Sequence, residues 1–191
     1  MSNNENYSTR LLQQQSWFSQ INSISWTGKT DDMSELDTKK TTSWQMFNRI
    51  SRRYDLLNRL LSARRDVVWR KKCARMLPPR SGLRVLDLAT GTADVAIALL
   101  KERPDIAMTI GLDPAIDMLK IGRKKCKKND TTVELINGDA QQLSLKSNSV
   151  DVITMAFGIR NVANIEVAFQ EMFRVMTDRG RLIILEFSLP T

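Results

Sequence analysis

Downstream of Gly82, short apolar runs alternate with stretches of helical periodicity. The apolar runs are typical of buried strands and cover Arg84–Ala89, Met108–Leu112, Val133–Asn137, Val150–Ala156 and Arg181–Phe187. Apolar residues at three- and four-residue steps predict helices over Asp94–Lys101, Ala115–Lys128 and Ile165–Met176. Strands that alternate with helices predict an α/β fold with a doubly wound, mostly parallel sheet and right-handed crossovers.

The pattern changes upstream of this region. Helical spacing runs from Thr42 to Met76, and Pro78 and Pro79 end it. Residues 1–41 are polar and keep no lasting period, which predicts a flexible arm. We therefore divide the chain into an arm (1–41), a helical segment (42–79) and an α/β domain (80–191).

The composition excludes several classes of catalytic and metal site. The chain has 191 residues, a formal net charge of +8 and no histidine. The missing histidine excludes a Ser-His-Asp triad, an HExxH zinc site and a Cys-His nucleophile pair. Cys73 and Cys126 are far apart in sequence, so we predict free thiols in a reducing compartment and no metal site. No apolar run approaches the roughly 18 residues of a membrane-spanning helix, and the start lacks the pattern of a secretory signal. We expect a cytoplasmic protein.

Two candidate site segments follow the first two predicted strands, at the sheet edge where ligands of parallel sheets bind. Asp87 lies in the first strand, and Thr-Gly-Thr follows with Gly91, which allows a tight turn and close ligand approach. An acid before that turn disfavours pyrophosphate and suits a cationic ligand. Asp113 ends the second strand and can accept both hydroxyls of a ribose. The alternatives are a structural glycine turn and a helix-capping aspartate.

Two further segments follow the third and fourth predicted strands. Asp139 and Ala140 can read an adenine through a carboxylate and an adjacent amide, although Gly-Asp is also an ordinary turn. Arg160 and Asn161 follow the fourth strand in AFGIRN. Together, the segments describe a ligand with a cation, a carboxylate, a ribose and an adenine, namely S-adenosylmethionine (SAM).

The segments also carry a resemblance to a known family. The runs that carry it are VLDLATGTADVA, IGLDPAIDMLKIGRKK, NGDAQQLSL, SVDVITMAFGIRNV, FRVMTDRGRLIILEFSLP and the upstream MFNRISRRYDLLNRLLS. Over roughly residues 44–190 the chain resembles the ubiquinone/menaquinone biosynthesis C-methyltransferases (UbiE-like), a branch of the class I SAM-dependent methyltransferases. The resemblance implies methyl transfer from SAM to a ring carbon of a prenylated quinol, either demethylmenaquinol or the ubiquinol precursor.

The resemblance also implies roles for individual residues. The positions implied to contact SAM or shape its pocket are Asp87, Gly91, Thr92, Asp113, Asp139, Ala140 and Ala156. Tyr54, Arg160 and Asn161 would face the quinol, and residues 42–79 would help to cap it. Arg160 is the candidate catalytic residue, because a guanidinium can stabilise a phenolate or orient the water that takes its proton.

The chain departs from the family pattern in three places. Ala93 stands where the family commonly has glycine, and we expect it to be tolerated at a negative φ. Asp178-Arg-Gly180 replaces Pro-Gly-Gly, and we expect the turn before the fifth strand to persist. Relatives continue for about another quarter of their length beyond Thr191. We therefore expect the last two strands and much of the quinol pocket to be missing, and little turnover by these 191 residues.

Other functions fit parts of the pattern. The positive charge suits a nucleic-acid methyltransferase, but the fourth strand lacks the Asn-Pro-Pro-Tyr type of motif. The expected missing strands fit a non-catalytic SAM-binding fragment. The missing glycines and Asp87 disfavour a nicotinamide dehydrogenase. The basic runs Arg64–Arg75 and Arg123–Lys128 would be solvated helix faces or a peripheral contact with anionic lipids on the inner face of the membrane.

Overall fold

A computed structural model of the chain describes residues 65–186, which belong to one compact unit of the chain, residues 37–191. Within this range it contains four α-helices, one 3-10 helix and five strands. In chain order these are α4 (Arg65–Arg75), β1 (Arg84–Leu88), α5 (Asp94–Glu102), β2 (Met108–Asp113), α6 (Ile116–Lys128), β3 (Glu134–Asn137), β4 (Val150–Ala156), η1 (Ile159–Asn161), α7 (Ile165–Val175) and β5 (Met176–Leu185). The predicted arm 1–41, most of the segment 42–79 and Tyr54 lie outside the described residues.

The five strands form one sheet in the order β3-β2-β1-β4-β5. All four neighbouring pairs are parallel, as the alternation of strands and helices predicted. The order reverses between β1 and β4, since the chain first moves outward through β2 and β3 and then returns to the other side of β1. Such a switch point is where open parallel sheets bind ligands, beyond the carboxyl ends of the strands.

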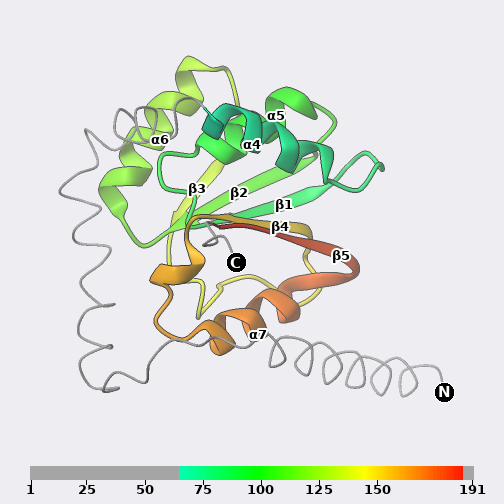
Figure 1. The fold of residues 1–191 in the computed structure, drawn as a ribbon, viewed down its shortest axis with the longest axis vertical. Coiled ribbons are helices and arrows are strands. Elements are labelled where there is room, and N and C mark those ends of the chain that lie inside the picture. The colour runs from blue at the N-terminus through cyan, green and yellow to red at the C-terminus, as the bar shows by residue number, and fades with distance from the viewer. Residues whose placement is uncertain (1–64, 187–191) are drawn as a thin grey trace. The chain divides into compact units, whose positions relative to one another are not determined.

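Helices cover both faces of the sheet. Figure 1 shows α4, α5 and α6 on one side and α7 on the other. Successive residues of a strand point to opposite faces, and β1 follows this rule. Val85 packs in a cluster with Cys73 and Leu77 beside α4, whereas Leu86 and Leu88 belong to a cluster that includes Met172 of α7. None of the helices in the described range is long and apolar enough to cross a membrane.

The segment predicted as a turn before the fifth strand forms a bulge at the start of β5. Residues 178–180 form part of β5, which pairs Met176 with Val150 and Arg181 with Val152. Six residues of β5 therefore span only three of β4, and the extra residues bulge out. Gly180 approaches Met176 so closely that a Cβ there would overlap the Met176 side chain. The requirement for glycine comes from this close approach, because Gly180 does not have a positive φ.

Candidate functional site

The turn between β1 and α5 has an unusual backbone. Ala89, Gly91 and Ala93 all adopt left-handed conformations, with φ of 51°, 55° and 63°. Glycine adopts such a φ without penalty, whereas an L-residue with a Cβ loses roughly 1–2 kcal/mol. The condition under which we expect alanine to be tolerated at position 93, a negative φ, is therefore not met. This turn needs three alternating left-handed residues to leave β1 and enter α5, and two of them are alanines that the surroundings must hold in place.

Asp87 lies under this turn and is 1% exposed. The hydroxyl of Thr90 donates a hydrogen bond to one carboxylate oxygen, and that of Thr154 donates to the other, each at 2.6 Å. Burial raises the pKa of Asp87 to about 6, although both hydroxyl hydrogen bonds oppose the rise. Asp87 thus joins β1, the turn and β4 through neutral donors.

Asp113 at the end of β2 is 7% exposed and also holds the turn. One carboxylate oxygen accepts from the amide of Gly91 and the other from the amide of Ala115, both at 2.8 Å. Burial raises the pKa of Asp113, and the two amide hydrogen bonds oppose the rise. The residue therefore fixes the glycine turn and the approach to α6 together. Each carboxylate oxygen has a second lone pair, so these bonds leave acceptor capacity for a ligand.

Thr92 and Asp94, on either side of Ala93, contact α6. The Lys125 ammonium donates to the Thr92 hydroxyl and to an Asp94 carboxylate oxygen, each at 2.7 Å. The other Asp94 oxygen lies 3.3 Å from a guanidinium nitrogen of Arg70 in α4. Helices on both sides of α5 therefore bind its first residue.

The segment after β3 lies beside Asp113. The amide of Gly138 and the side chain of Asn137 both donate to the Asp113 carbonyl, at 3.2 and 3.0 Å. Asp139 is exposed, and its carboxylate accepts from the backbone and the side-chain amide of Gln141. Ala140 is 7% exposed and packs in the core. Asp139 is the more accessible member of the predicted pair.

The loop after β4 packs against the glycine turn. A Cβ on Gly158 would overlap the Cβ of Ala89, so the two loops touch at a position where only glycine fits. Phe157 has a φ of 56° and its ring lies 5.8 Å, between centroids, from that of Trp69 in α4. Ala156, the last residue of β4, is partly exposed. These contacts bring the ends of β1 and β4 and the helix α4 together.

Arg160 and Asn161 belong to η1, which follows this loop. The Arg160 guanidinium lies 3.4 Å from a carboxylate oxygen of Glu186, just past the end of β5, and its side chain is 50% exposed. Asn161 is partly exposed and its amide donates to the Gly158 carbonyl. The guanidinium of the candidate catalytic residue is therefore held in an ion pair, although half of its side chain is exposed to solvent.

Among the predicted site residues, a hydrogen bond links Gly91 to Asp113, and Thr90, the residue before Gly91, donates to Asp87. The sequence reading missed Thr90, Thr154 and Lys125. Thr154 could have been found as a polar residue inside an otherwise apolar part of VDVITMA, two strand positions from Val152 on the same face. Lys125 offered no comparable signal, because a lysine in a basic helix is usually solvated.

Comparison with known proteins gives the family. Residues 34–191 match the ubiE/COQ5 methyltransferase family. The chain is 43% identical over 145 residues to a demethylmenaquinone methyltransferase of Thermus thermophilus, covering 76% of this chain and 66% of that protein. It is 40% identical over 147 residues to the Porphyromonas gingivalis protein of the same name, covering 76% of this chain and 60% of that protein. The chain thus spans less than two thirds of the length of these curated relatives.

Solved structures agree on the fold. A SAM-dependent methyltransferase from Thermotoga maritima matches with a TM-score of 0.58 and 28% identity, over 74% of this chain and 60% of that one. A SAM-dependent methyltransferase from Aquifex aeolicus matches with a TM-score of 0.58 and 23% identity, over 62% of this chain and 64% of that one. The extent of the family match, most of the chain, decides the assignment: this chain belongs to the ubiE/COQ5 methyltransferase family.

Proposed function

We propose that this chain carries the SAM-binding part of a C-methyltransferase that methylates the ring of a prenylated quinol, with demethylmenaquinol as the substrate. The observation that carries the proposal is the Asp113 carboxylate, which joins the glycine turn to the end of β2 through Gly91. The curated relatives named above are demethylmenaquinone methyltransferases, which favours the naphthoquinol over the benzoquinol.

The chemistry of the donor set fits SAM. Two buried carboxylates, Asp87 and Asp113, underlie the turn, and a third, Asp139, lies exposed after β3. Such a set disfavours pyrophosphate and favours an ammonium, a sulfonium and ribose hydroxyls. In this proposal Thr92, Asp113, Asp139, Ala140 and Ala156 contact SAM, while Asp87 and Gly91 shape its pocket.

Bound SAM supplies a methyl group already activated by a sulfonium, so the chain needs to align the reactants and balance charge. A quinol hydroxyl has a pKa near that of tyrosine, about 10. Its deprotonation places nucleophilic density on the neighbouring ring carbon. Arg160, with Asn161 and Tyr54 beside the quinol, would hold the phenolate oxygen or the water that takes its proton.

Binding of S-adenosylhomocysteine, the demethylated product, tests the SAM site by calorimetry. We expect a measurable dissociation constant for the 191-residue chain, and no detectable heat at millimolar ligand would contradict the proposal. Methyl transfer from labelled SAM to a short-chain demethylmenaquinol is then measured with this chain and with the protein as its gene encodes it. Binding without transfer in the protein as its gene encodes it would favour the non-catalytic alternative, and an RNA gel shift reversed by salt would favour the nucleic-acid one.

The role of Arg160 is tested with Arg160→Ala in the protein as its gene encodes it. Loss of charge stabilisation should lower kcat about a hundredfold with little change in S-adenosylhomocysteine affinity. Arg179→Ala is a matched control, because Arg179 is an exposed arginine in the β5 bulge. Near-normal turnover by folded Arg160→Ala would reject the catalytic role.

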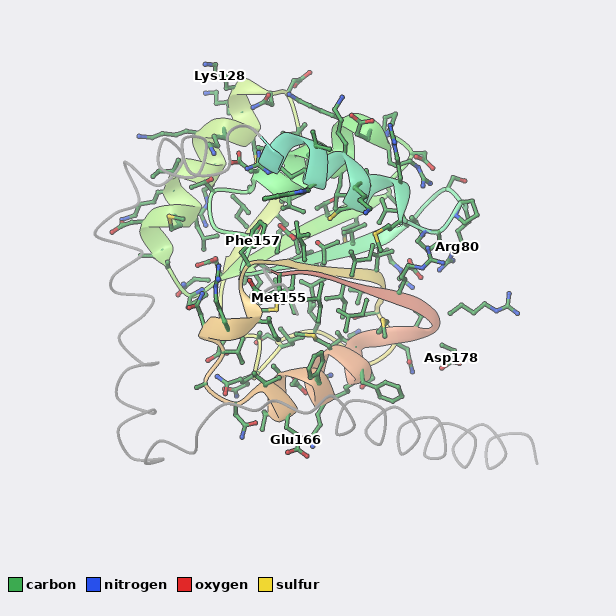
Figure 2. The ribbon with its side chains drawn as sticks, in the orientation of Figure 1. Arg80, Lys128, Met155, Phe157, Glu166 and Asp178 are labelled. Carbon is green, nitrogen blue, oxygen red and sulfur yellow. The ribbon has the colours of Figure 1, made fainter. Side chains whose placement is uncertain are left out.

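A peripheral contact with anionic lipids is the finer part of the proposal. Exposed basic residues and the exposed Val68 and Met76 share one surface of α4 and its end, and further lysines are exposed on α6. Figure 2 shows Lys128 of α6 and Glu166 of α7 on opposite sides of the sheet. Each basic residue near an anionic surface contributes about 1 kcal/mol. Sedimentation with phosphatidylglycerol vesicles at low salt, compared with phosphatidylcholine vesicles, tests this contact, and equal recovery with both would contradict it.

A further inference from the structure

The start of α5 is strained and lacks the usual support. Ala93, its N-cap residue, adopts a φ of 63° and provides no side-chain cap. Serine, threonine, aspartate or asparagine at an N-cap would normally satisfy a free amide of the first helical turn. Something outside the turn must therefore hold Ala93 in a conformation that alanine rarely adopts.

Lys125 is placed to do this. Its ammonium contacts Thr92 and Asp94, the two residues that flank Ala93, at 2.7 Å each. The lysine side chain is 20% exposed and the Asp94 side chain 27%. A solvated surface pair has little geometric constraint, but here one ammonium bridges a carboxylate and a buried hydroxyl on either side of a single residue.

The close packing of α6 on the turn makes this bridge possible. One turn before Lys125 lies Gly122, where a Cβ would stand 3.3 Å from the carbonyl carbon of Thr92 and 3.4 Å from the Cβ of Ala93. A larger residue there would push α6 away from the turn. The helix backbone thus lies directly against the residues that Lys125 binds.

We propose that Lys125 is a positioning residue for the cofactor turn: by bridging Thr92 and Asp94 it holds Ala93 in its left-handed conformation and so fixes the turn that binds SAM. The inference rests on the proposed function for its ligand, but the effect on the turn itself does not need a ligand. Lys125 would act through Thr92, without itself contacting the reacting atoms.

Lys125→Met keeps the length of the side chain and removes the ammonium. We expect S-adenosylhomocysteine to bind about tenfold more weakly, because two charge-assisted hydrogen bonds to the turn are lost. Lys128→Met removes the same charge from the exposed end of the same helix and should leave the affinity within about twofold. Equal affinities for the parent and Lys125→Met would overturn the inference.

Ala93→Gly separates positioning from general stabilisation. Glycine reaches a φ of 63° without help, so in an Ala93→Gly background Lys125→Met should cost no more than about threefold in affinity. A loss as large as that in the parent background would show that Lys125 does not act through the conformation of Ala93, and would overturn the inference.

A ligand-free measurement keeps the inference separate from the proposed function. The amides of Gly91 and Ala93 donate within the turn assembly, to Asp113 and to the Thr90 carbonyl. In Lys125→Met their hydrogen exchange should accelerate about tenfold, and in Lys128→Met it should not change. If the parent chain fails to bind S-adenosylhomocysteine, the proposed function fails, and unchanged exchange in Lys125→Met overturns the inference independently.

Discussion

A buried carboxylate lies at each end of the central strands β1 and β4, and the pKa values of the two carboxylates are shifted in opposite directions. At the amino end, Asp151 accepts hydrogen bonds from the backbone and the guanidinium of Arg84 and from Arg80. Burial by itself would raise the pKa of Asp151, but these bonds hold it well below its usual range. At the carboxyl end, Asp87 has hydroxyl donors and a raised pKa, about 6. Figure 2 places Arg80 and Phe157 at these two ends.

The different donors distinguish a carboxylate that stabilises the fold from a carboxylate at the candidate ligand-binding edge. Asp151 is compensated by two arginines, so its charge is used within the fold. The hydroxyls around Asp87 bring no positive charge, so its negative charge costs stability in the ligand-free protein. A perturbed carboxylate of this kind at a ligand-binding edge is typical of a functional site, because a cationic ligand can supply the missing charge.

Asp151→Asn should produce the largest loss of stability. Breaking a buried ion pair costs about 3–5 kcal/mol, and the half-exposed arginines reduce this to about 2–3 kcal/mol at pH 7. Because the pKa of Asp151 is lowered by folding, its contribution is present above about pH 4 and is lost as the pH falls further. Urea unfolding at several pH values measures this, and S-adenosylhomocysteine affinity should stay unchanged. A variant as stable as the parent at pH 7 would contradict the conclusion that the charge of Asp151 stabilises the fold.

Asp87→Asn should instead increase the stability of the protein at neutral pH. The pKa of Asp87 is raised to about 6 by folding, so the native state binds the proton more tightly than the unfolded state. The stability linked to this group is fully present below about pH 4 and is lost as the pH rises through about 6. The amide does not ionise, so the variant should be more stable than the parent by about 2–3 kcal/mol at pH 7 and should match it below pH 4. A variant less stable than the parent at pH 7 would contradict the assignment of an uncompensated charge.

Gly158→Ala tests the packing at the carboxyl end. The added Cβ would overlap Ala89, and overpacking of this kind costs about 1–2 kcal/mol. Ala89→Gly removes the opposing methyl and relaxes a positive φ, so the double variant should regain most of the lost stability. Thermal unfolding of the two single variants and the double variant measures the coupling. Additive losses would show that the two loops do not touch in solution.

Arg80→Met should have the smallest effect. The Arg80 guanidinium makes one contact with Asp151, at 2.9 Å, and its side chain is 52% exposed, whereas the Arg84 guanidinium makes two, at 3.0 and 3.2 Å. The loss should therefore stay below about 1 kcal/mol, and Arg84→Met should cost more. The same urea titration compares them, and a larger loss for Arg80→Met would reverse the ranking within the cluster.

The sequence predicted which residues lie at the candidate site, but not the backbone conformation that holds them there. A carboxylate inside β1, a glycine after it and an acid at the end of β2 could be placed at one sheet edge, because parallel strands end on the same side. The positive φ of Ala93 could not be predicted from the sequence. Alanine by itself prefers a negative φ, and only contacts with neighbouring elements can overcome that preference. The sequence did not predict the form of the segment Asp178–Gly180, because that form depends on the shift in register between β4 and β5.

The sequence by itself determined the order of strands and helices, the fold class and the family, because hydrophobic periodicity and motif spacing are properties of neighbouring residues. Tertiary structure decided which donors reach each buried carboxylate. Thr154 is 67 positions from Asp87, Arg84 is 67 from Asp151, and Lys125 is 31 from Asp94. Contacts over such separations depend on strand order and helix packing. Burial without a cationic donor raises the pKa of Asp87, whereas the arginine hydrogen bonds lower that of Asp151.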